Sequence, residues 1–211
     1  MATNLLVSTY VRLLVSLLVL LISAASQLAK PAYGQSRDPM VVMTTTKGTI
    51  VMRIYTGLAP NTAANFLDLV NRGFYNGLTF HRVEGWVIQG GDPNGNGTGS
   101  FVDPDSGQPR LLRLEVSPRL HHNAPGVVAM AHSRSPNSAS CQFYITKQAV
   151  PYLDGQYAIF GGVVRGLNVV YNIQVGDRIQ SAEIVYPGGN QGPRDSAHAS
   201  NQTPPAGDSG F

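Results

Sequence analysis

Two glutamines stand in short apolar runs of the central sequence, and an arginine precedes the first of them. Gln89 ends the run Trp86–Gln89, and Gln142 begins the run Gln142–Thr146. A buried amide without hydrogen-bond partners is costly, so we expect both side chains to face a wet groove and bind polar groups there. The alternative is a structural glutamine bonded to a loop. Arg82 adds a guanidinium that stays charged and donates hydrogen bonds. Groups of these types can bind a polar ligand and donate hydrogen bonds to it.

The other reactive residue types form no recognisable catalytic pattern. His121 and His122 are adjacent, so in a strand they would face opposite sides, and no third ligand stands at zinc spacing. Gly95–Gly99 lacks both a following helix and a Lys-Ser/Thr pair, which favours a turn-rich loop over a phosphate site. Cys141 is the only cysteine, which excludes an intramolecular disulfide, and no basic neighbour activates it. We therefore expect no metal and no other cofactor.

Short apolar runs separated by Gly, Pro and Asn predict the elements that position these residues. Lys47-Gly48 between the first two runs predicts a hairpin turn, and helices are expected from Pro60 to Gly73 and over Leu167–Ile173. An antiparallel sheet with short connections must stack or close to hide its edges. We favour a closed barrel capped by the two helices, although periodicity alone does not separate a barrel from a sandwich. The expected strands are Met40–Thr45, Thr49–Tyr55, Thr79–Val83, Trp86–Gln89, Val127–Ala131, Gln142–Thr146, Ala158–Val164 and Arg178–Tyr186.

The first residues have the pattern of a secretory signal peptide. Met1–Arg12 carries one positive charge and no acid, and Leu13–Ala25 is an apolar run. That run is shorter than the roughly 20 residues of a membrane-spanning helix. Ala32-Tyr33-Gly34 fits the small-x-small rule, so we predict removal of residues 1–34, with cleavage nearer Ala29 or an uncleaved anchor as alternatives. The mature protein would have no membrane span and would lie in a periplasm, a thylakoid-type lumen or outside the cell.

The remaining chain divides into a domain over residues 38–186 and a tail over residues 187–211. The tail is rich in Gly, Pro, Ser and Asn with almost no large apolar residue, which predicts disorder.

The formal net charge is +3, and Arg12 and Lys30 of the first segment contribute most of it. No Lys/Arg cluster remains in the domain, so we expect no nucleic-acid partner. We expect the protein to be a monomer.

Blocks of the central sequence resemble the cyclophilin family in their order and spacing. One block alone could arise by chance, but their shared order spans the domain from Val41 to about Val185. The resemblance implies an eight-stranded antiparallel barrel with a helix at each end, and a groove on its outer face for a proline-containing peptide. The blocks are Phe80-His81-Arg82, Gln89-Gly90-Gly91-Asp92, Gly97-Thr98-Gly99, Met130-Ala131, Gln142-Phe143-Tyr144-Ile145, Leu153-Asp154-Gly155, Tyr157 and Phe160-Gly161.

The resemblance also implies peptidyl-prolyl cis–trans isomerisation. Rotation about a peptide bond costs about 18–20 kcal/mol, and X–Pro isomers exchange in tens to hundreds of seconds. A catalyst need only stabilise the twisted amide, without a cofactor. By the resemblance, Arg82 is the catalytic residue, because it would donate a hydrogen bond to the prolyl nitrogen. The substrate-binding residues would be Trp86, Val87, Tyr144 and Leu153 around the proline ring, Gln89 and Gln142 on the peptide backbone, and Ala131 and Tyr157 beside them.

Some positions depart from the family pattern. The loop between Arg82 and Gln89 is shorter than usual, Trp86 stands where phenylalanine is common, and His132 replaces an asparagine. Tyr157 stands where many members have histidine, a change common among bacterial-looking members. We predict a bacterial-like isomerase that acts on X–Pro bonds during the folding of exported proteins. A catalytically weak peptide binder or chaperone module of the same fold is the alternative. An unrelated all-β carbohydrate or lipid binder would require the blocks to be accidental.

Overall fold

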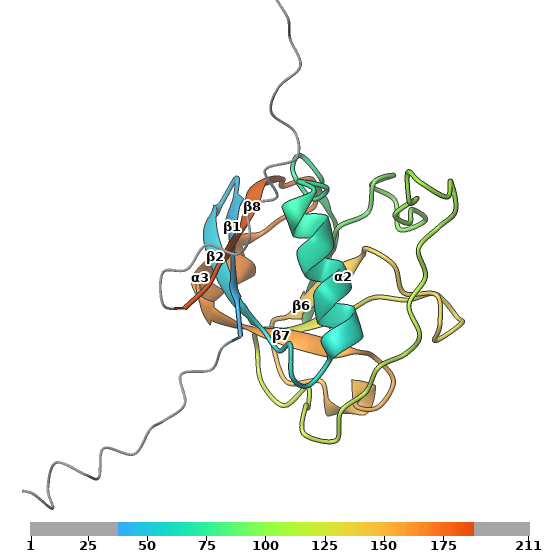
Figure 1. Cartoon of the computed structure of the whole chain (residues 1–211). Coiled ribbons are helices and arrows are strands. Elements are labelled where there is room, and N and C mark those ends of the chain that lie inside the picture. Colours follow the sequence, from blue (N-terminus) through green and yellow to red (C-terminus); the bar gives the residue numbers. More distant parts are fainter. Residues whose placement is uncertain (1–37, 188–211) are drawn as a thin grey trace, which may run out of the picture. The chain divides into compact units, whose positions relative to one another are not determined.

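The computed structural model describes residues 38–187, so the predicted signal peptide and nearly all of the predicted tail lie outside the described residues. Within this range, eight antiparallel strands form one curled sheet, accompanied by two α-helices and a 3-10 helix (Figure 1). The predicted mainly-β class, eight strands and two helices are confirmed. The elements are β1 (Met40–Thr45), β2 (Gly48–Ile54), α2 (Pro60–Asn71), β3 (Phe80–Val83), β4 (Val87–Gly90), β5 (Val127–Met130), β6 (Phe143–Thr146), η1 (Pro151–Leu153), β7 (Ile159–Arg165), α3 (Leu167–Asn172) and β8 (Ile179–Val185).

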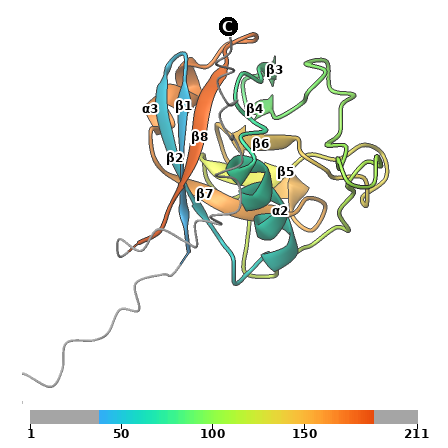
Figure 2. The ribbon, with the colours of Figure 1, turned by 45° about the horizontal axis from the view of Figure 1, so that its top comes forward.

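The strands follow the order β3-β4-β6-β5-β7-β2-β1-β8 (Figure 2). This order leaves β3 and β8 as the two edge strands, and they share no ladder. Thr79 and Arg178, the residues just before these strands, form an isolated bridge. The Phe80 amide also donates to the Asp177 carbonyl at 2.9 Å. The sheet therefore curls until its edges meet at one bridge, and the expected full closure of the barrel is not confirmed.

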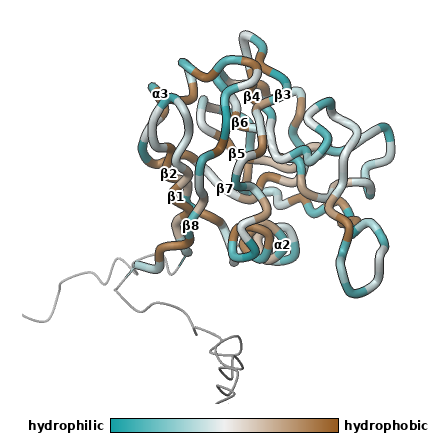
Figure 3. Tube along the Cα trace, turned by 90° about the horizontal axis from the view of Figure 1, so that it is seen from above, coloured by the Kyte–Doolittle hydropathy of each residue, from teal (hydrophilic) through white to brown (hydrophobic). Residues whose placement is uncertain are grey.

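Aromatic rings fill the interior of the curled sheet and anchor helix α2. Phe66 of α2 is completely buried, with its ring centroid 4.8 Å from that of Phe160 and 5.5 Å from that of Phe143. The Tyr75 ring lies 5.1 Å from Phe66, and its hydroxyl donates to the Cys141 carbonyl at 3.0 Å. Large rings bury much apolar area, so this cluster holds α2 against β7 and β8. In Figure 3, hydrophobic colouring runs through the strands, whereas the long loops are mostly pale or hydrophilic.

A second apolar cluster lies on the other face of the same strands. Successive side chains of a strand point to opposite faces, so Phe143 faces the interior and its neighbour Tyr144 faces outward. Tyr144 packs there with three other buried residues, Val87, Ala129 and Ile159. Partly buried side chains around them, among them Trp86, Leu153 and Tyr157, cover this cluster. The outer face of the sheet is therefore apolar and largely covered where β4, β5, β6 and β7 meet.

The turn between β1 and β2 differs by one residue from the prediction. Thr45 pairs with Gly48, so the turn residues are Thr46 and Lys47 rather than Lys47 and Gly48. Gly48 has a φ of +126° and begins β2, where a Cβ atom would lie 3.1 Å from a methyl carbon of Val169 in α3. The glycine therefore serves the close approach of α3 to β2, as well as the unusual backbone angle.

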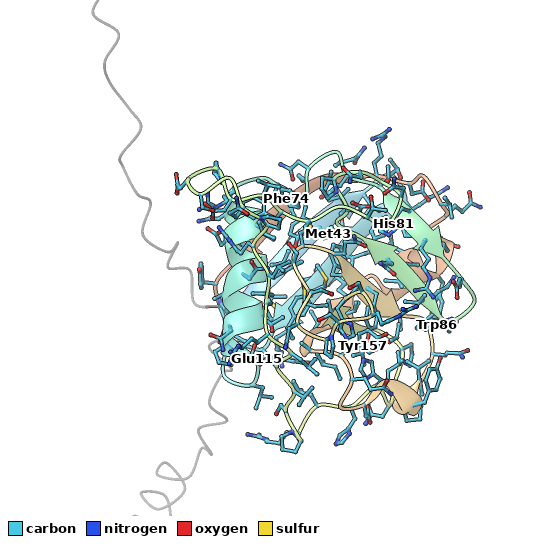
Figure 4. All side chains as sticks on the ribbon, turned by 90° about the vertical axis from the view of Figure 1, so that its right-hand side faces the viewer. Met43, Phe74, His81, Trp86, Glu115 and Tyr157 are labelled. Carbon is cyan, nitrogen blue, oxygen red and sulfur yellow. The ribbon has the colours of Figure 1, made fainter. Side chains whose placement is uncertain are left out.

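Helix α2 is capped by a distant residue. Its N-cap, Ala59, makes no side-chain hydrogen bond. The Glu115 carboxylate, from the long β4–β5 connection, accepts from the amides of Thr62 at 2.7 Å and Asn61 at 3.2 Å (Figure 4). Burial raises the pKa of Glu115, but these bonds outweigh it and lower the pKa overall. The carboxylate thereby satisfies free helix donors at the positive end of the helix dipole.

Neither helix within residues 38–187 is long and apolar enough to cross a membrane.

Two glycines with matched backbone angles allow the packing next to β4 to be tested. A Cβ atom on Gly91, with a φ of +83°, would lie 2.6 Å from the Cys141 carbonyl oxygen. On Gly77, with a φ of +84°, it would meet no atom within 4 Å. We expect Gly91→Ala to lower the free energy of unfolding by about 1–3 kcal/mol more than Gly77→Ala. Both substitutions place a Cβ atom at the same positive φ, so their backbone effects match, but only Gly91→Ala also overpacks its surroundings. Denaturant unfolding measures this difference, and equal losses would contradict the tight packing.

Candidate functional site

The register of the sheet aligns one row of residues across five strands. Arg82 of β3 pairs with Gln89 of β4, which pairs with Tyr144 of β6. Tyr144 pairs in turn with Ala129 of β5, and Ala129 pairs with Ile159 of β7. Residues directly opposite each other in antiparallel strands share a face, so the whole row lies on the outer face. The row runs from charged and polar residues at one end to apolar residues at the other.

Two adjacent cavities open on this face, and together they contain eight of the nine predicted site residues. The first, of about 380 Å³, is lined by Arg82, Trp86, Gln89, Ala131, Tyr144, Leu153 and Tyr157. The second, of about 290 Å³, shares Gln89 and Ala131 with the first and adds Gln142. Its other lining groups are largely hydroxyls, from Thr98, Ser100, Ser133, Ser138 and Ser140. In Figure 4, Trp86 and Tyr157 both lie to the right of helix α2. The structure thus gathers residues that are far apart in the sequence around one continuous groove.

Val87 is the predicted groove residue that lines neither cavity. Its side chain points outward, like that of Gln89, but it is completely buried in the outer apolar cluster with Tyr144 and Ala129. Trp86 and Leu153 pack against this cluster and separate it from solvent. Val87 therefore supports the groove from beneath, and a peptide in the first cavity would not reach it.

Arg82 and the two glutamines form a directional chain of hydrogen bonds. Arg82 Nη1 donates to Gln89 Oε1 at 3.2 Å, and Gln89 Nε2 donates to Gln142 Oε1 at 2.9 Å. Gln142 Nε2 then donates to the carbonyl oxygens of Gly99 at 2.9 Å and Gly97 at 3.1 Å. Because a guanidinium has donors only, this chain fixes the orientation of both amides. Both glutamines line the groove, and Gln142 also bonds to the adjoining loop, whereas Gln89 bonds only to the other two side chains of the chain.

The glycine-rich loop beside the groove folds around a buried carboxylate. Asp92 is 1% exposed and accepts hydrogen bonds from the backbone amides of Asn94, Asn96, Gly97 and Gly99. Burial raises the pKa of Asp92, but the four amide bonds outweigh it and lower the pKa overall. The loop amides that could have bound a phosphate are already satisfied by an internal anion. The loop instead forms part of the groove wall, because Gly97, Thr98 and Gly99 line the second cavity.

His122 connects two walls of the groove, although its sequence context gives no signal for this role. Its ring is completely buried, with Nδ1 2.9 Å from Asp154 Oδ1 and Nε2 2.8 Å from the Tyr144 hydroxyl. An ionised carboxylate only accepts, so Nδ1 carries the hydrogen and the neutral ring accepts from Tyr144 at Nε2. Burial lowers the pKa of His122, and Asp154 opposes this only in part. The bond to Asp154 also holds its neighbour Leu153, so one side chain positions both Tyr144 and Leu153.

Two histidines other than His122 line the first cavity, namely His81 and His132. His132 stacks on Tyr157 with ring centroids 4.3 Å apart, and its two nitrogens lie 2.7 and 2.8 Å from the carbonyl oxygens of Ser133 and Gln156. Both ring nitrogens of His81 are buried without a hydrogen-bond partner in the described part of the chain, and burial lowers the pKa of His81. The position of His81 next to Arg82 was the sequence signal that could have identified it.

The groove has the groups needed to bind and polarise a peptide. It combines a guanidinium, two oriented amides and an apolar slot between aromatic rings, with Tyr144 and Tyr157 packed edge to face at 5.7 Å. Among residues 38–187, no group of three or more His, Cys, Asp or Glu side chains is arranged to hold a metal ion.

Comparisons with known proteins agree on one family. The family model described as cyclophilin type peptidyl-prolyl cis-trans isomerase/CLD matches residues 40–187. The chain is 43% identical over 131 residues to peptidyl-prolyl cis-trans isomerase ppi1 of Schizosaccharomyces pombe, a match that covers 61% of this chain and 81% of the relative. It is 38% identical over 138 residues to peptidyl-prolyl cis-trans isomerase-like 1 of Mus musculus, covering 65% and 80%. A Cryptosporidium parvum cyclophilin type peptidyl-prolyl cis-trans isomerase, crystallised in the presence of the dipeptide Ala-Pro, has a TM-score of 0.63 and 29% identity, covering 69% of this chain and 98% of that one.

The buried histidine predicts a loss of stability in weak acid. The pKa of His122 is below its ordinary value of 6.5 in the folded protein, so below about pH 6.5 the unfolded chain binds the proton more readily. The free energy of unfolding should be constant above that pH and decrease as the pH falls below it, so it should be lower at pH 5.5 than at pH 7.5. His81 contributes in the same direction.

We expect His122→Gln to reduce this decrease, measured as the difference between the free energies of unfolding at the two pH values. His121→Gln is the matched control, because His121 also contacts Asp154 but is 52% exposed at its side chain. The same pH dependence in wild type and His122→Gln would show that another group causes it.

Proposed function

The chain belongs to the cyclophilin-type peptidyl-prolyl cis–trans isomerase family, and we propose that the first cavity is where it isomerises X–Pro bonds, with Arg82 as catalytic residue. Its enzymatic activity is peptidyl-prolyl cis–trans isomerisation, and proline-containing polypeptides are what it binds. One observation carries the proposal for the site. The Arg82–Gln89–Gln142 chain of hydrogen bonds and the apolar slot lie side by side in the same groove.

Arg82 supplies what the reaction needs electrostatically. Twisting the amide destroys its resonance and leaves a lone pair on the prolyl nitrogen, which can then accept a hydrogen bond. A guanidinium has five N–H donors. Arg82 uses Nε toward Glu84 and Nη1 toward Gln89, so donors remain for a peptide in the cavity. A donor that interacts better with the twisted state than with either planar isomer lowers the barrier in both directions.

The aromatic side of the cavity would hold the proline ring while the preceding residue rotates. Tyr144, Leu153 and Tyr157 line this side together with Trp86. Tyr144 is held in place by His122, and Tyr157 by its stack on His132. The Cryptosporidium relative was crystallised in the presence of the dipeptide Ala-Pro, which supports a proline-containing ligand for this chain. Gln89 and Gln142 would bind the polar backbone of the same peptide.

We also propose that the protein is a bacterial-like, exported member of the family that acts on exported polypeptides. Export is supported by Met1–Arg12 and Leu13–Ala25, which have the charge and hydrophobicity of a signal peptide. The bacterial-like subtype is supported by Tyr157, which stands where many members have histidine. The relatives named above are eukaryotic, so this subtype rests on the sequence of the chain itself. We propose a periplasm, a thylakoid-type lumen or the extracellular space as its location. We further propose that it acts as a monomer and does not bind nucleic acid.

The catalytic role of Arg82 is tested by the cis-to-trans conversion of a short X–Pro peptide. We expect Arg82→Ala to lower kcat/KM by about 100-fold, the usual effect of removing one donor from a preorganised site. Arg165→Ala, which removes an exposed arginine at the end of β7, should leave kcat/KM unchanged. Full activity in Arg82→Ala would contradict this mechanism. Peptide binding by folded wild type without acceleration would favour a binding module instead.

Export is tested by expressing the full chain and determining the mass and N-terminal residue of the product in each cell fraction. We expect a product that lacks residues 1–34, on the far side of the membrane. Leu18→Arg should trap the uncleaved chain inside the cell, because it places a charge in the apolar run. Full-length wild-type protein held in the membrane would mean that the segment is an anchor, and full-length soluble protein inside the cell would contradict export.

A further inference from the structure

Arg82 belongs to a three-residue cluster at the end of the β3–β4 hairpin. Its Nε donates to Glu84 Oε1 at 2.7 Å, and Trp86 Nε1 donates to Glu84 Oε2 at 2.8 Å. The guanidinium carbon of Arg82 also lies 5.1 Å from the centroid of the Trp86 ring. Each of these three side chains therefore contacts the other two. We call Arg82, Glu84 and Trp86 the rim cluster, because Arg82 and Trp86 line the first cavity.

The short hairpin brings these residues together. β3 ends at Val83 and β4 begins at Val87, and the Glu84 amide donates to the Val87 carbonyl at 2.9 Å. Arg82 and Glu84 are two residues apart at the end of β3 and share a face. The turn over Gly85 and Trp86 brings the indole to the same side, where it bonds to Glu84. The Lys147 amide donates to the Trp86 carbonyl at 2.7 Å, which ties the turn to the end of β6. The turn is thus fixed by backbone bonds, and the carboxylate of Glu84 lies between its two donors.

The rim cluster restricts how Arg82 can present its remaining donors. A guanidinium is planar, and here one nitrogen is held by Glu84 while another is held by Gln89. Two contacts on different nitrogens define the plane of the group. The arginine side chain is therefore ordered before the peptide binds. The conformational entropy of ordering it does not add to the barrier of the reaction. The second oxygen of Glu84 holds the indole, which forms the adjoining wall of the cavity.

We propose that Glu84 is a positioning residue of the isomerase site, which orients the Arg82 guanidinium toward the prolyl nitrogen and holds Trp86 as a wall of the proline slot. The proposal rests on the function proposed for Arg82. Glu84 does not line the first cavity itself, so its effect passes through its two partners.

The contribution of Glu84 to the stability of the fold should be small. The side chains of Arg82 and Glu84 are 42% and 45% exposed, and solvent-exposed ion pairs stabilise proteins little. The hydrogen bond from Arg82 holds the pKa of Glu84 below its ordinary value, so the carboxylate stays ionised at neutral pH. Loss of Glu84 should therefore change the activity of the folded enzyme rather than the amount of folded enzyme.

The chain has one tryptophan, so its intrinsic fluorescence reports directly on the rim cluster. The test variant is Glu84→Gln, which keeps the size of the side chain but places an amide N–H₂ where one donor needs an acceptor. Glu183→Gln is the matched control, because it makes the same charge change at an exposed position of β8. Both variants are made in the full chain, and the probe is a short Ala-Pro-containing peptide.

We expect Glu84→Gln to lower the catalysed exchange rate at saturating peptide by about 3- to 10-fold, since one charge-assisted bond to the arginine is lost. The dissociation constant of the peptide should change less, by about twofold at most, because Glu84 makes no contact in the cavity. The emission spectrum of Trp86 should shift, and the thermal unfolding midpoint should stay within the error of the wild-type value. Glu183→Gln should match wild type in all four measurements.

A double variant separates positioning from a general structural effect. If Glu84 acts on the reaction through Arg82 and only in part through Trp86, Glu84→Gln should cause a clearly smaller fall in exchange rate when Arg82 is already alanine. Equal losses in both backgrounds would overturn the proposal, as would wild-type exchange and fluorescence in Glu84→Gln. Unimpaired activity in Arg82→Ala would instead overturn the proposed function. A large loss in Arg82→Ala with no effect of Glu84→Gln would overturn this inference alone.

Discussion

The register between β4 and β6 is the constraint on which the site depends. It sets Gln89 opposite Tyr144 and Gly90 opposite Phe143, so one pair faces the groove and the other faces the interior. A slip of one residue would exchange these faces, because side chains alternate along a strand. The ring contacts of Phe143 with Phe66 and Tyr75 prevent this slip. The aromatic core thereby determines which residues face a bound peptide.

The loops around the groove are held by acceptors that lie inside the molecule. Asp92 binds four amides of the 93–99 loop, and the Gln142 side chain binds two carbonyl oxygens of the same loop. On the other side, Asp154 and His122 hold the segment that carries Leu153. A groove with its walls already positioned loses less conformational entropy when a peptide binds. This matters for an isomerase, since the substrate must twist while the protein stays in place.

The polar groups of the site differ in how firmly they are held. Tyr144 and His122 are buried and bonded to each other, and burial raises the pKa of the Tyr144 phenol. The rim cluster is half exposed, so water and salt weaken its electrostatic interactions. The buried pair can therefore contribute to stability, whereas the exposed cluster can change the behaviour of Arg82 at little cost in stability.

The amino-acid sequence was enough to predict the strands, the two helices and, from recognisable blocks, most of the residues that line the two cavities. In β2, for example, Ile50, Met52 and Ile54 alternate with less buried residues, and such a period of two can be recognised from the local sequence alone. Tertiary structure alone decided that Val87 is covered, that His122 bonds to Tyr144, and that Glu84 holds both Arg82 and Trp86. It also decided that the sheet edges meet at a single bridge. Local patterns indicate which face a side chain takes, but what covers it or bonds to it depends on side-chain geometry and on segments brought together only by folding.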